Sequence, residues 1–247
     1  ASLGSSLVLR NLEGVAAERI ILIGLGKKDD YNAKAVLKAH ESLAKLCNSL
    51  SLDEASNTLL LEPAKKLSTI ESARFAARTL ENAQYCYTAT LGEEAKKEKD
   101  TPSLSTVTFI TDGADDTAIE AAIAQGKAIA QGMALTRELG NLPGNIATPS
   151  YLGEQAKALA KEYTSLEVKV LEKKQIEALK MGSFLSVAAG SEQPPRFIVL
   201  HHKPKTADKS QAPIVFVGKG VTFDTGGISL KPGAGMDEMK WDMCGAA

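Results

Sequence analysis

The sequence predicts an α/β protein made of two domains that a long helix joins. Short apolar, β-branched runs alternate with segments whose apolar residues recur at helical spacing, which is typical of sheets covered by helices. Residues 115–140 form an alanine-rich stretch with acidic residues at its start and Gly140 at its end, as helix termini favour. Proline and glycine then break this pattern. We therefore expect domains over residues 1–114 and 141–247, with residues 115–140 as the connecting helix.

The first domain is expected to contain three strands and two helices. Ser68, followed by Glu71 three residues later, forms the pattern of a capping box at the start of the second helix. The mixed charges of residues 91–101 indicate a solvated loop. His40 is expected to be a packed or solvated helix residue, since no other ligand type lies at metal-ligand spacing beside it. The expected strands cover residues 19–27 (running into a glycine turn), 57–61 and 106–110, and the expected helices cover residues 31–50 and 68–87.

Two glycines lie inside the connecting helix, at Gly126 and Gly132. Glycine costs stability in a helix interior, so its presence there usually has a packing reason. We therefore expect close helix packing at both positions.

The second domain is expected to hold a mainly parallel sheet covered on both faces, because strands alternate with helices. Thr148 is placed to cap its first helix, with Pro149 at the first helical position. His201 and His202 are adjacent on a strand and point to opposite faces, so both can hardly serve one metal. The expected helices cover residues 149–163 and 173–181, and the expected strands cover residues 166–171, 196–202 and 214–217, the last of them buried.

Charge and cysteine usage narrow the function classes. Lys and Arg number 29 against 30 Asp and Glu, so the net charge of −1 offers no global basic footprint for nucleic acid. No apolar run reaches the ~18 residues that span a bilayer. Three widely spaced cysteines fit a reducing compartment without a disulfide framework. We expect a cytoplasmic protein without a membrane segment.

The chemistry-bearing stretch follows the apolar run at 214–217. Lys219, Asp224, Lys231 and Asp242 lie there among glycines, which let the backbone approach a ligand closely. Charged side chains on a glycine-rich turn after a strand are typical of active sites in α/β sheets. A solvated polar loop is equally compatible with the composition. A phosphate cradle at Gly218 is a weaker alternative, because the Walker spacing is missing.

Residues 217–232 (VGKGVTFDTGGISLKP) and 235–247 (GMDEMKWDMCGAA) resemble the signature of the leucine aminopeptidases, a family of cytosolic two-metal exopeptidases. In that family a long helix joins the N-terminal domain to the catalytic one, and residues 137–145 (RELGNLPGN) resemble the segment at that junction. The resemblance implies an α/β/α metallopeptidase catalytic domain, of which only the first part is present. It also implies a homo-hexamer that acts on peptides with a free amino terminus and prefers leucine-like residues there.

The resemblance assigns roles to individual residues. Lys219, Asp224 and Asp242 match the family's metal ligands, with Asp224 bridging two divalent ions, Zn or Mn, with Mg or Co as alternatives. Lys219 would bind as the neutral amine, its pKa lowered by a nearby dication and by partial burial. Lys231 matches the catalytic lysine, which would bind substrate and stabilise the oxyanion while staying charged. Met239 matches a methionine of the substrate-binding pocket.

The chain also departs from the family pattern. The family completes its site with a later Asn-Thr-Asp-Ala-Glu-Gly-Arg segment that brings a further Asp ligand, a bridging Glu and an Arg. That segment does not occur in these 247 residues, and the first domain resembles one that is incomplete at its start. We expect a fragment that is inactive by itself. A non-catalytic binding relative, or a DNA-binding architectural relative, is the alternative function.

Overall fold

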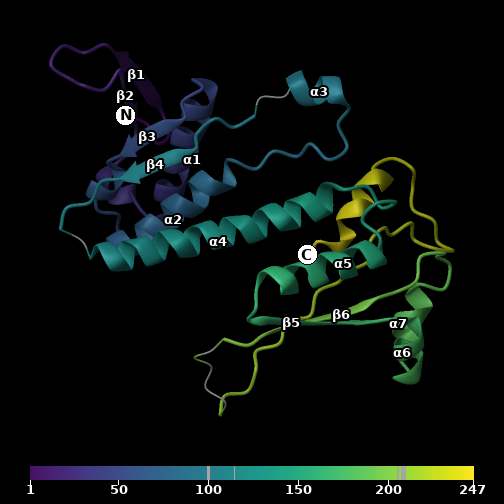
Figure 1. The fold of residues 1–247 in the computed structure, drawn as a ribbon. Helices are drawn as coiled ribbons and strands as arrows, with labels where there is room; N and C mark the ends of the chain where they lie inside the picture. Colours follow the sequence, from purple (N-terminus) through teal and green to yellow (C-terminus); the bar gives the residue numbers. More distant parts are fainter. Residues whose placement is uncertain (99–100, 114, 205, 207–209) are drawn as a thin grey trace. The chain divides into compact units, whose positions relative to one another are not determined.

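The computed structural model describes residues 1–98, 101–113, 115–204, 206 and 210–247, and it confirms the mixed α/β class (Figure 1). The chain divides into two compact units, residues 1–135 and 136–247. The division falls inside the long helix. The predicted limits of the two domains and the connector remain predictions.

Unit 1 packs two helices against short strand pairs. β1 and β2 form an antiparallel hairpin, and β3 and β4 form a parallel pair. Leu43 and Cys47 of the first helix meet Leu80 of the second in a buried cluster, against which the strand residue Val107 packs. The elements are β1 (Ser6–Arg10), β2 (Arg19–Ile23), η1 (Lys28–Asp30), α1 (Ala33–Ser49), β3 (Glu54–Asn57), η2 (Leu59–Leu61), α2 (Thr69–Asn82), α3 (Glu93–Glu98) and β4 (Thr106–Phe109).

The capping box of α2 is confirmed. The Ser68 hydroxyl accepts the Glu71 N–H at 3.2 Å, and the Glu71 carboxylate accepts the Ser68 N–H at 2.9 Å. These two bonds satisfy two donors that a helix start leaves without intrahelical partners. The helix ends at Asn82, five residues before the predicted Tyr87.

The expected strand over residues 57–61 is wrong. The strand β3 ends at Asn57, whose side-chain oxygen accepts the Leu59 N–H at 2.9 Å. Such a local side-chain bond turns the chain and competes with a strand ladder. Leu59–Leu61 then form the 3-10 helix η2, and Leu60 is buried in the core.

The loop expected over residues 91–101 contains the short helix α3 instead. Its first turn carries Glu93 and Glu94, and its last turn carries Lys96 and Lys97, which complements the helix dipole. Lys96 pairs with Glu93 at 2.8 Å.

The strand β1 was not predicted, since its apolar run is short and partly exposed.

α4 (Asp116–Asn141) is the long helix that the sequence predicts. Ile119 and Ala122 pack on Ala73 and Ala76 of α2. At Gly126 a Cβ would overlap the Arg74 carbonyl oxygen and lie 3.0 Å from the Ala77 Cβ, so close packing is confirmed there. At Gly132 a Cβ would meet no described atom within 4 Å, so that part of the expectation is wrong.

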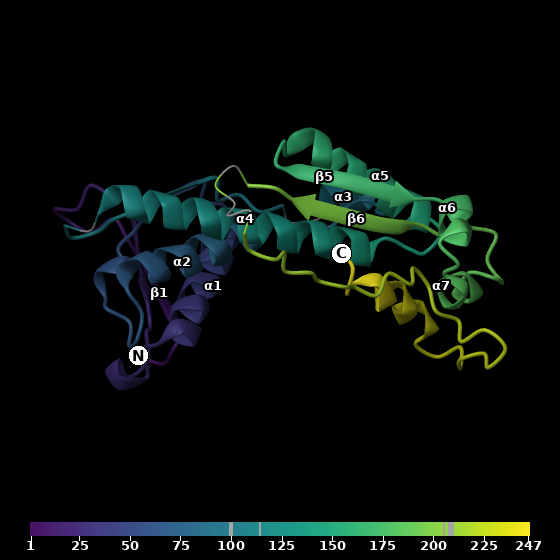
Figure 2. The same ribbon diagram turned by 90° about the horizontal axis from the view of Figure 1, so that it is seen from below.

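Unit 2 places α5 along one face of a two-stranded sheet made of β5 and β6 (Figures 1 and 2). Gly153 of α5 allows this approach, because a Cβ there would lie 3.2 Å from Val170 of β5. Besides the end of α4, the elements are α5 (Pro149–Glu162), β5 (Leu166–Leu171), α6 (Lys173–Ala178), α7 (Gly182–Val187), β6 (Phe197–His202) and η3 (Met236–Met243).

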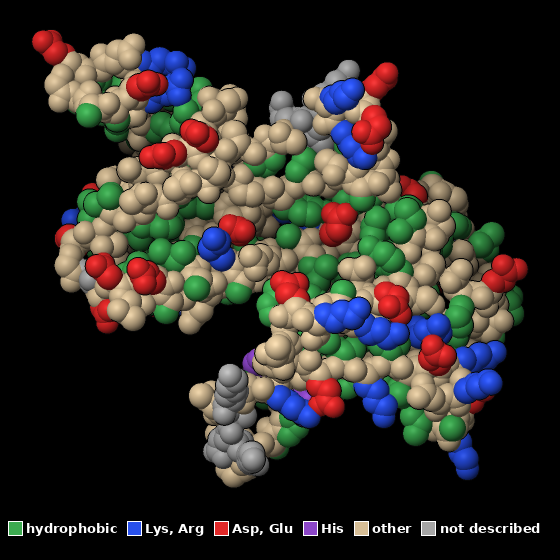
Figure 3. Space-filling model, viewed as in Figure 1, with side chains coloured by type: hydrophobic (Ala, Val, Ile, Leu, Met, Phe, Trp, Pro, Cys, Tyr) green, Lys and Arg blue, Asp and Glu red, His purple; other side chains and the backbone are tan. Residues whose placement is uncertain are grey.

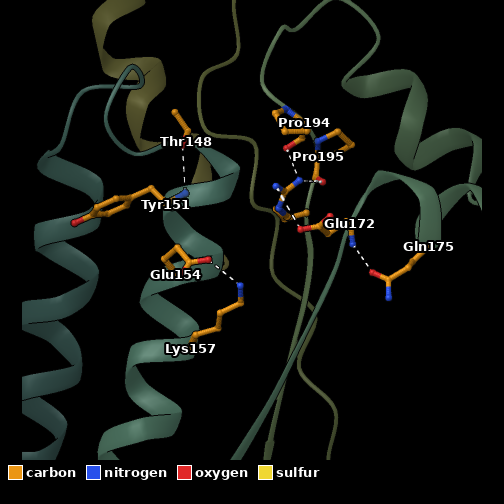
Figure 4. A network of polar contacts seen from close by, with 9 residues as sticks. Thr148, Tyr151, Glu154, Lys157, Glu172, Gln175, Pro194 and Pro195 are labelled. Carbon is orange, nitrogen blue, oxygen red and sulfur yellow. Dashed lines mark hydrogen bonds and ion pairs between the residues drawn. The ribbon is translucent and has the colours of Figure 1, made fainter.

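Local capping signals fix the helix starts in unit 2 (Figure 4). The Thr148 hydroxyl accepts the Tyr151 N–H at 3.2 Å, and Pro149 occupies the first turn, so the predicted start of α5 is confirmed. At the start of α6 the Gln175 side-chain oxygen accepts the Glu172 N–H at 2.8 Å.

The sheet of unit 2 is antiparallel rather than mainly parallel, which corrects the prediction. Leu166 pairs with His202, and Leu171 pairs with Phe197. The connecting helices α6 and α7 lie beyond the ends of the two strands in both ribbon views, so the chain reverses direction between them (Figures 1 and 2). A parallel pair requires a crossover along the sheet face instead.

The buried strand expected at residues 214–217 is also not observed. Ile214, Val215, Phe216 and Val217 are 83%, 75%, 91% and 94% exposed, and no described strand pairs with them. An apolar run becomes a strand only when a neighbouring strand accepts its backbone hydrogen bonds.

The described residues include no helix with the length and apolar character to cross a membrane. On the face drawn in Figure 3, acidic and basic side chains lie interspersed among hydrophobic ones.

Candidate metal centre

Two segments of unit 2 build the candidate site: the glycine-rich loop over residues 218–231 and the 3-10 helix η3. The loop begins against the residues that follow η3, because a Cβ on Gly218 would overlap the carbonyl oxygen of Gly245. Only glycine permits this backbone approach. η3 itself is held by the fully buried side chain of Met243. The loop and the helix are therefore packed directly on each other.

The first predicted pair, Lys219 and Asp242, is brought together. Lys219 Nζ donates to Asp242 Oδ1 at 2.7 Å, and this bond raises the pKa of the Lys219 amine. The other carboxylate oxygen, Oδ2, is buried and has no hydrogen-bond partner among the described residues. A buried carboxylate oxygen without a partner is costly, so its position suits a cation or another donor.

The second predicted pair, Asp224 and Lys231, also meets. Lys231 Nζ lies 2.8 Å from Asp224 Oδ2, and the Gly226 N–H donates to Asp224 Oδ1 at 2.9 Å. The lysine bond, followed by the backbone bond, holds the pKa of the Asp224 carboxyl below its usual range. Gly226 has φ of 90°, a conformation that favours glycine, and the Lys231 N–H closes the turn on the Thr225 carbonyl at 2.9 Å.

Met239 completes the group of predicted residues. Its sulfur lies 3.1 Å from Lys231 Nζ. Met239 and Asp242 are three residues apart in η3, and side chains at this spacing eclipse in a 3-10 helix. The helix therefore presents the thioether and the carboxylate on one side, toward the two lysines. The structure brings all five predicted residues into one place, while their assigned roles stay predictions.

These donors fit part of a divalent-cation site. Asp224 and Asp242 provide carboxylate oxygens, and the negative charge of Asp224 contributes to the raised pKa of Lys219. The described residues hold no group of three or more His, Cys, Asp or Glu side chains that could bind a metal. Lys219 would have to lose its proton to act as a ligand. The expected partial burial of Lys219 is wrong, because its side chain is 58% exposed. A lowered pKa would therefore depend on a dication beside the amine.

The two histidines weighed as metal ligands lie on β6, outside the loop and the helix η3 that carry this group. His201 and His202 are both exposed on β6. Cys244 packs on Gly140, where an added Cβ would lie 2.8 Å from the cysteine sulfur. Gly226 belongs to the glycines that the sequence predicts to let the backbone approach a ligand, whereas Thr225 was not predicted to shape the site. The paired glycines after Asp224 were the available signal, since adjacent glycines mark a turn with positive φ.

Comparisons with known proteins bear on both units. Residues 1–93 match the model of the cytosol aminopeptidase family, N-terminal domain, and residues 134–247 match that of the cytosol aminopeptidase family, catalytic domain. The chain belongs to the cytosol aminopeptidase family. The family resemblance and the fold that it implies are confirmed.

Curated relatives in the cytosol aminopeptidase family are similar over nearly the whole chain. A probable cytosol aminopeptidase of Bordetella pertussis is 52% identical over 99% of this chain and 49% of its own length. One of Burkholderia lata is 47% identical over 98% of this chain and 47% of its own length. The chain thus spans about half the length of the curated relatives that it matches.

Solved structures of similar fold include two with the same TM-score of 0.80. A mutant of tomato leucine aminopeptidase is 30% identical and covers 99% of this chain and 45% of its own. The bottromycin maturation enzyme BotP in complex with Mn is 27% identical and covers 99% of this chain and 48% of its own.

Proposed function

We propose that the protein, at the length of its curated relatives, is a metal-dependent aminopeptidase that releases N-terminal residues, preferably leucine-like ones, from peptides. One observation carries the proposal: two lysine–carboxylate pairs and a methionine meet at one place, where a buried Asp242 oxygen has no described partner. Membership of the cytosol aminopeptidase family supports the same reaction class.

Lys219, Asp224 and Asp242 would hold the divalent ions, with Asp224 between two of them. Bound ions of this kind activate a water and polarise the scissile carbonyl. Zn or Mn are the favoured ions, with Mg or Co as alternatives, and the Mn complex of BotP supports manganese. Lys219 would have to give up the proton that Asp242 stabilises on it before its amine could hold an ion.

Lys231 would hold the substrate carbonyl and stabilise the negative charge that develops on its oxygen. Its ammonium is half-buried and fixed between Asp224 and Met239, so little reorganisation is needed. Met239 would line the pocket for the first side chain of the peptide, where an apolar, flexible thioether suits leucine.

The proposal extends to the setting of the enzyme. We expect a cytoplasmic homo-hexamer that acts on peptides with a free amino terminus. We also expect the 247 residues alone to be inactive, since the site offers two carboxylates and one amine, and the described residues add no cluster of ligands. Two ions need more donors than these.

Release of leucine from a leucyl amide by the full-length protein tests the proposal. Turnover should require Mn²⁺ or Zn²⁺, stop with a chelator, and fall by about 10² or more in Lys231→Ala. Lys157→Ala is the matched control, because Lys157 pairs with Glu154 on the exposed side of α5. Turnover without divalent metal would overturn the proposal. Absence of turnover together with salt-dependent DNA binding would favour the non-catalytic alternative.

A further inference from the structure

We propose that Met239 is a positioning residue for Lys231: its sulfur is the uncharged acceptor that aims the lysine ammonium at the substrate carbonyl. This inference rests on the proposed function, and it gives Met239 a task besides lining a pocket. It starts from the 3.1 Å contact between Met239 Sδ and Lys231 Nζ.

The ammonium of Lys231 has three N–H donors. In the structure one is directed at Asp224 Oδ2 at 2.8 Å and one at Met239 Sδ at 3.1 Å. The third has no acceptor among the residues that the structure describes and is available to a ligand. Two fixed acceptors orient a flexible side chain that would otherwise lose rotamer freedom each time it binds.

The two acceptors differ in charge, and this difference gives Met239 its importance. Asp224 is anionic, and under the proposed function its oxygens are shared with cations, which weakens its hold on Lys231. A thioether is a weak, neutral acceptor. It directs the N–H bond without cancelling the positive charge that the developing oxyanion needs.

The fold keeps the sulfur in place from both sides. Met239 belongs to η3, which is held by the buried Met243 and which carries Asp242 on the same side as Met239. Lys231 is held through its backbone N–H on the Thr225 carbonyl. The helix therefore sets the positions of a proposed metal ligand and of the lysine together.

The test compares Met239→Leu with Met239→Gln in the full-length enzyme, using leucyl and alanyl amides. Leucine keeps the apolar volume and removes the acceptor, so kcat should fall about three- to tenfold for both substrates. Glutamine supplies an oxygen at similar reach, so kcat should recover while KM for the leucyl amide rises. Met236→Leu, the same change at the start of η3, should leave kcat unchanged.

Two results would overturn the inference. One is a Met239→Leu enzyme whose kcat equals that of the wild type and whose ratio of KM values for leucyl and alanyl amide alone is changed. That result is expected if Met239 only lines the substrate pocket. The other concerns the ¹³C methyl resonance of Met239 in the metal-free enzyme. The inference predicts that this resonance shifts in Lys231→Gln and does not shift in Lys157→Gln. An unchanged resonance in Lys231→Gln would show that Met239 and Lys231 are not in contact. An inactive wild-type enzyme would instead contradict the proposed function and leave this resonance test in force.

Discussion

At the scale of single residues, each of the two lysines of the candidate site pairs with one oxygen of a carboxylate. The second oxygens of these two carboxylates differ in their hydrogen-bond partners. Asp224 Oδ1 accepts the Gly226 N–H at 2.9 Å. Asp242 keeps its buried Oδ2 without a described partner. The second arrangement is the one that a cation would complete.

Asp242→Asn should therefore lower the affinity of the full-length protein for Mn²⁺ by about tenfold or more, because it replaces a charged ligand with a neutral one of the same shape. Titration calorimetry with Mn²⁺ measures this directly. Asp237→Asn is the control, since Asp237 is an exposed carboxylate in the same helix η3. Equal affinities for the two variants would remove Asp242 from the set of ligands.

His40 is a residue whose charge state is tied to folding. Its side chain is fully buried, and Nδ1–H donates to the Val36 carbonyl at 2.8 Å, while Nε2 has no described partner. Burial lowers the pKa of His40, and the bond to Val36 only partly offsets this. The structure confirms a packed helix histidine.

The free energy of unfolding of unit 1 should fall as pH drops below about 6.5, the pKa of His40 in the unfolded chain. The sign follows from the lowered folded pKa: the unfolded chain binds the proton first, so acid favours unfolding. For one histidine the slope has an upper limit of about 1.4 kcal/mol per pH unit. Urea titrations between pH 5 and about pH 8 measure it. His40→Leu should flatten the slope, and His202→Gln, on an exposed strand residue, should not.

At the scale of elements, α4 offers a matched pair of glycines. A Cβ at Gly126 would overlap the backbone of Arg74 and lie 2.9 Å from the Arg78 nitrogen, whereas a Cβ at Gly132 would meet no described atom within 4 Å. Gly126→Ala should destabilise unit 1 by about 1–3 kcal/mol through overpacking against α2. Gly132→Ala should stabilise the helix by up to about 1 kcal/mol. Thermal and urea unfolding check both, and equal effects of the two changes would refute the packing role of Gly126.

Elements that depend on local signals were predicted well. The starts of α2 and α5 follow from Ser68, Glu71 and Thr148, whose side chains bond backbone groups within three residues. The strands and their pairing were predicted less accurately than the helix starts, because the two members of a strand pair lie far apart in sequence. Neither the antiparallel partner of β5 nor the missing partner of residues 214–217 can be read from an apolar run.

The candidate site shows the same division. The sequence motif predicted the five site residues that lie together in the structure, because all five belong to one glycine-rich loop and one short helix. It did not reveal which lysine pairs with which carboxylate, or that Met239 contacts Lys231. Those pairings depend on how η3 packs on the loop, where Gly218 meets Gly245.

At the scale of the whole molecule, the chain spans about half the length of its curated relatives and exposes an apolar run, Ile214–Val217, next to the site. Four consecutive exposed apolar residues are unusual on a monomer surface and mark a surface that another segment or chain covers. The run directly precedes Lys219, so its order bears on the geometry of the proposed ligands.

We expect residues 214–217 to be a paired strand in a protein of the relatives' full length, and an unpaired segment in the 247-residue chain. Backbone amides of residues 215–217 should then exchange at least about a hundredfold more slowly in the longer protein, because ladder hydrogen bonds protect them. Hydrogen exchange read by mass spectrometry measures this on both chains. The amides of β5, which pair with β6 in the structure, serve as the internal control and should be protected in both. Fast exchange at residues 215–217 in the longer protein would mean that the apolar run stays open even there, and the loop that carries Lys219 would have to be ordered by metal binding alone.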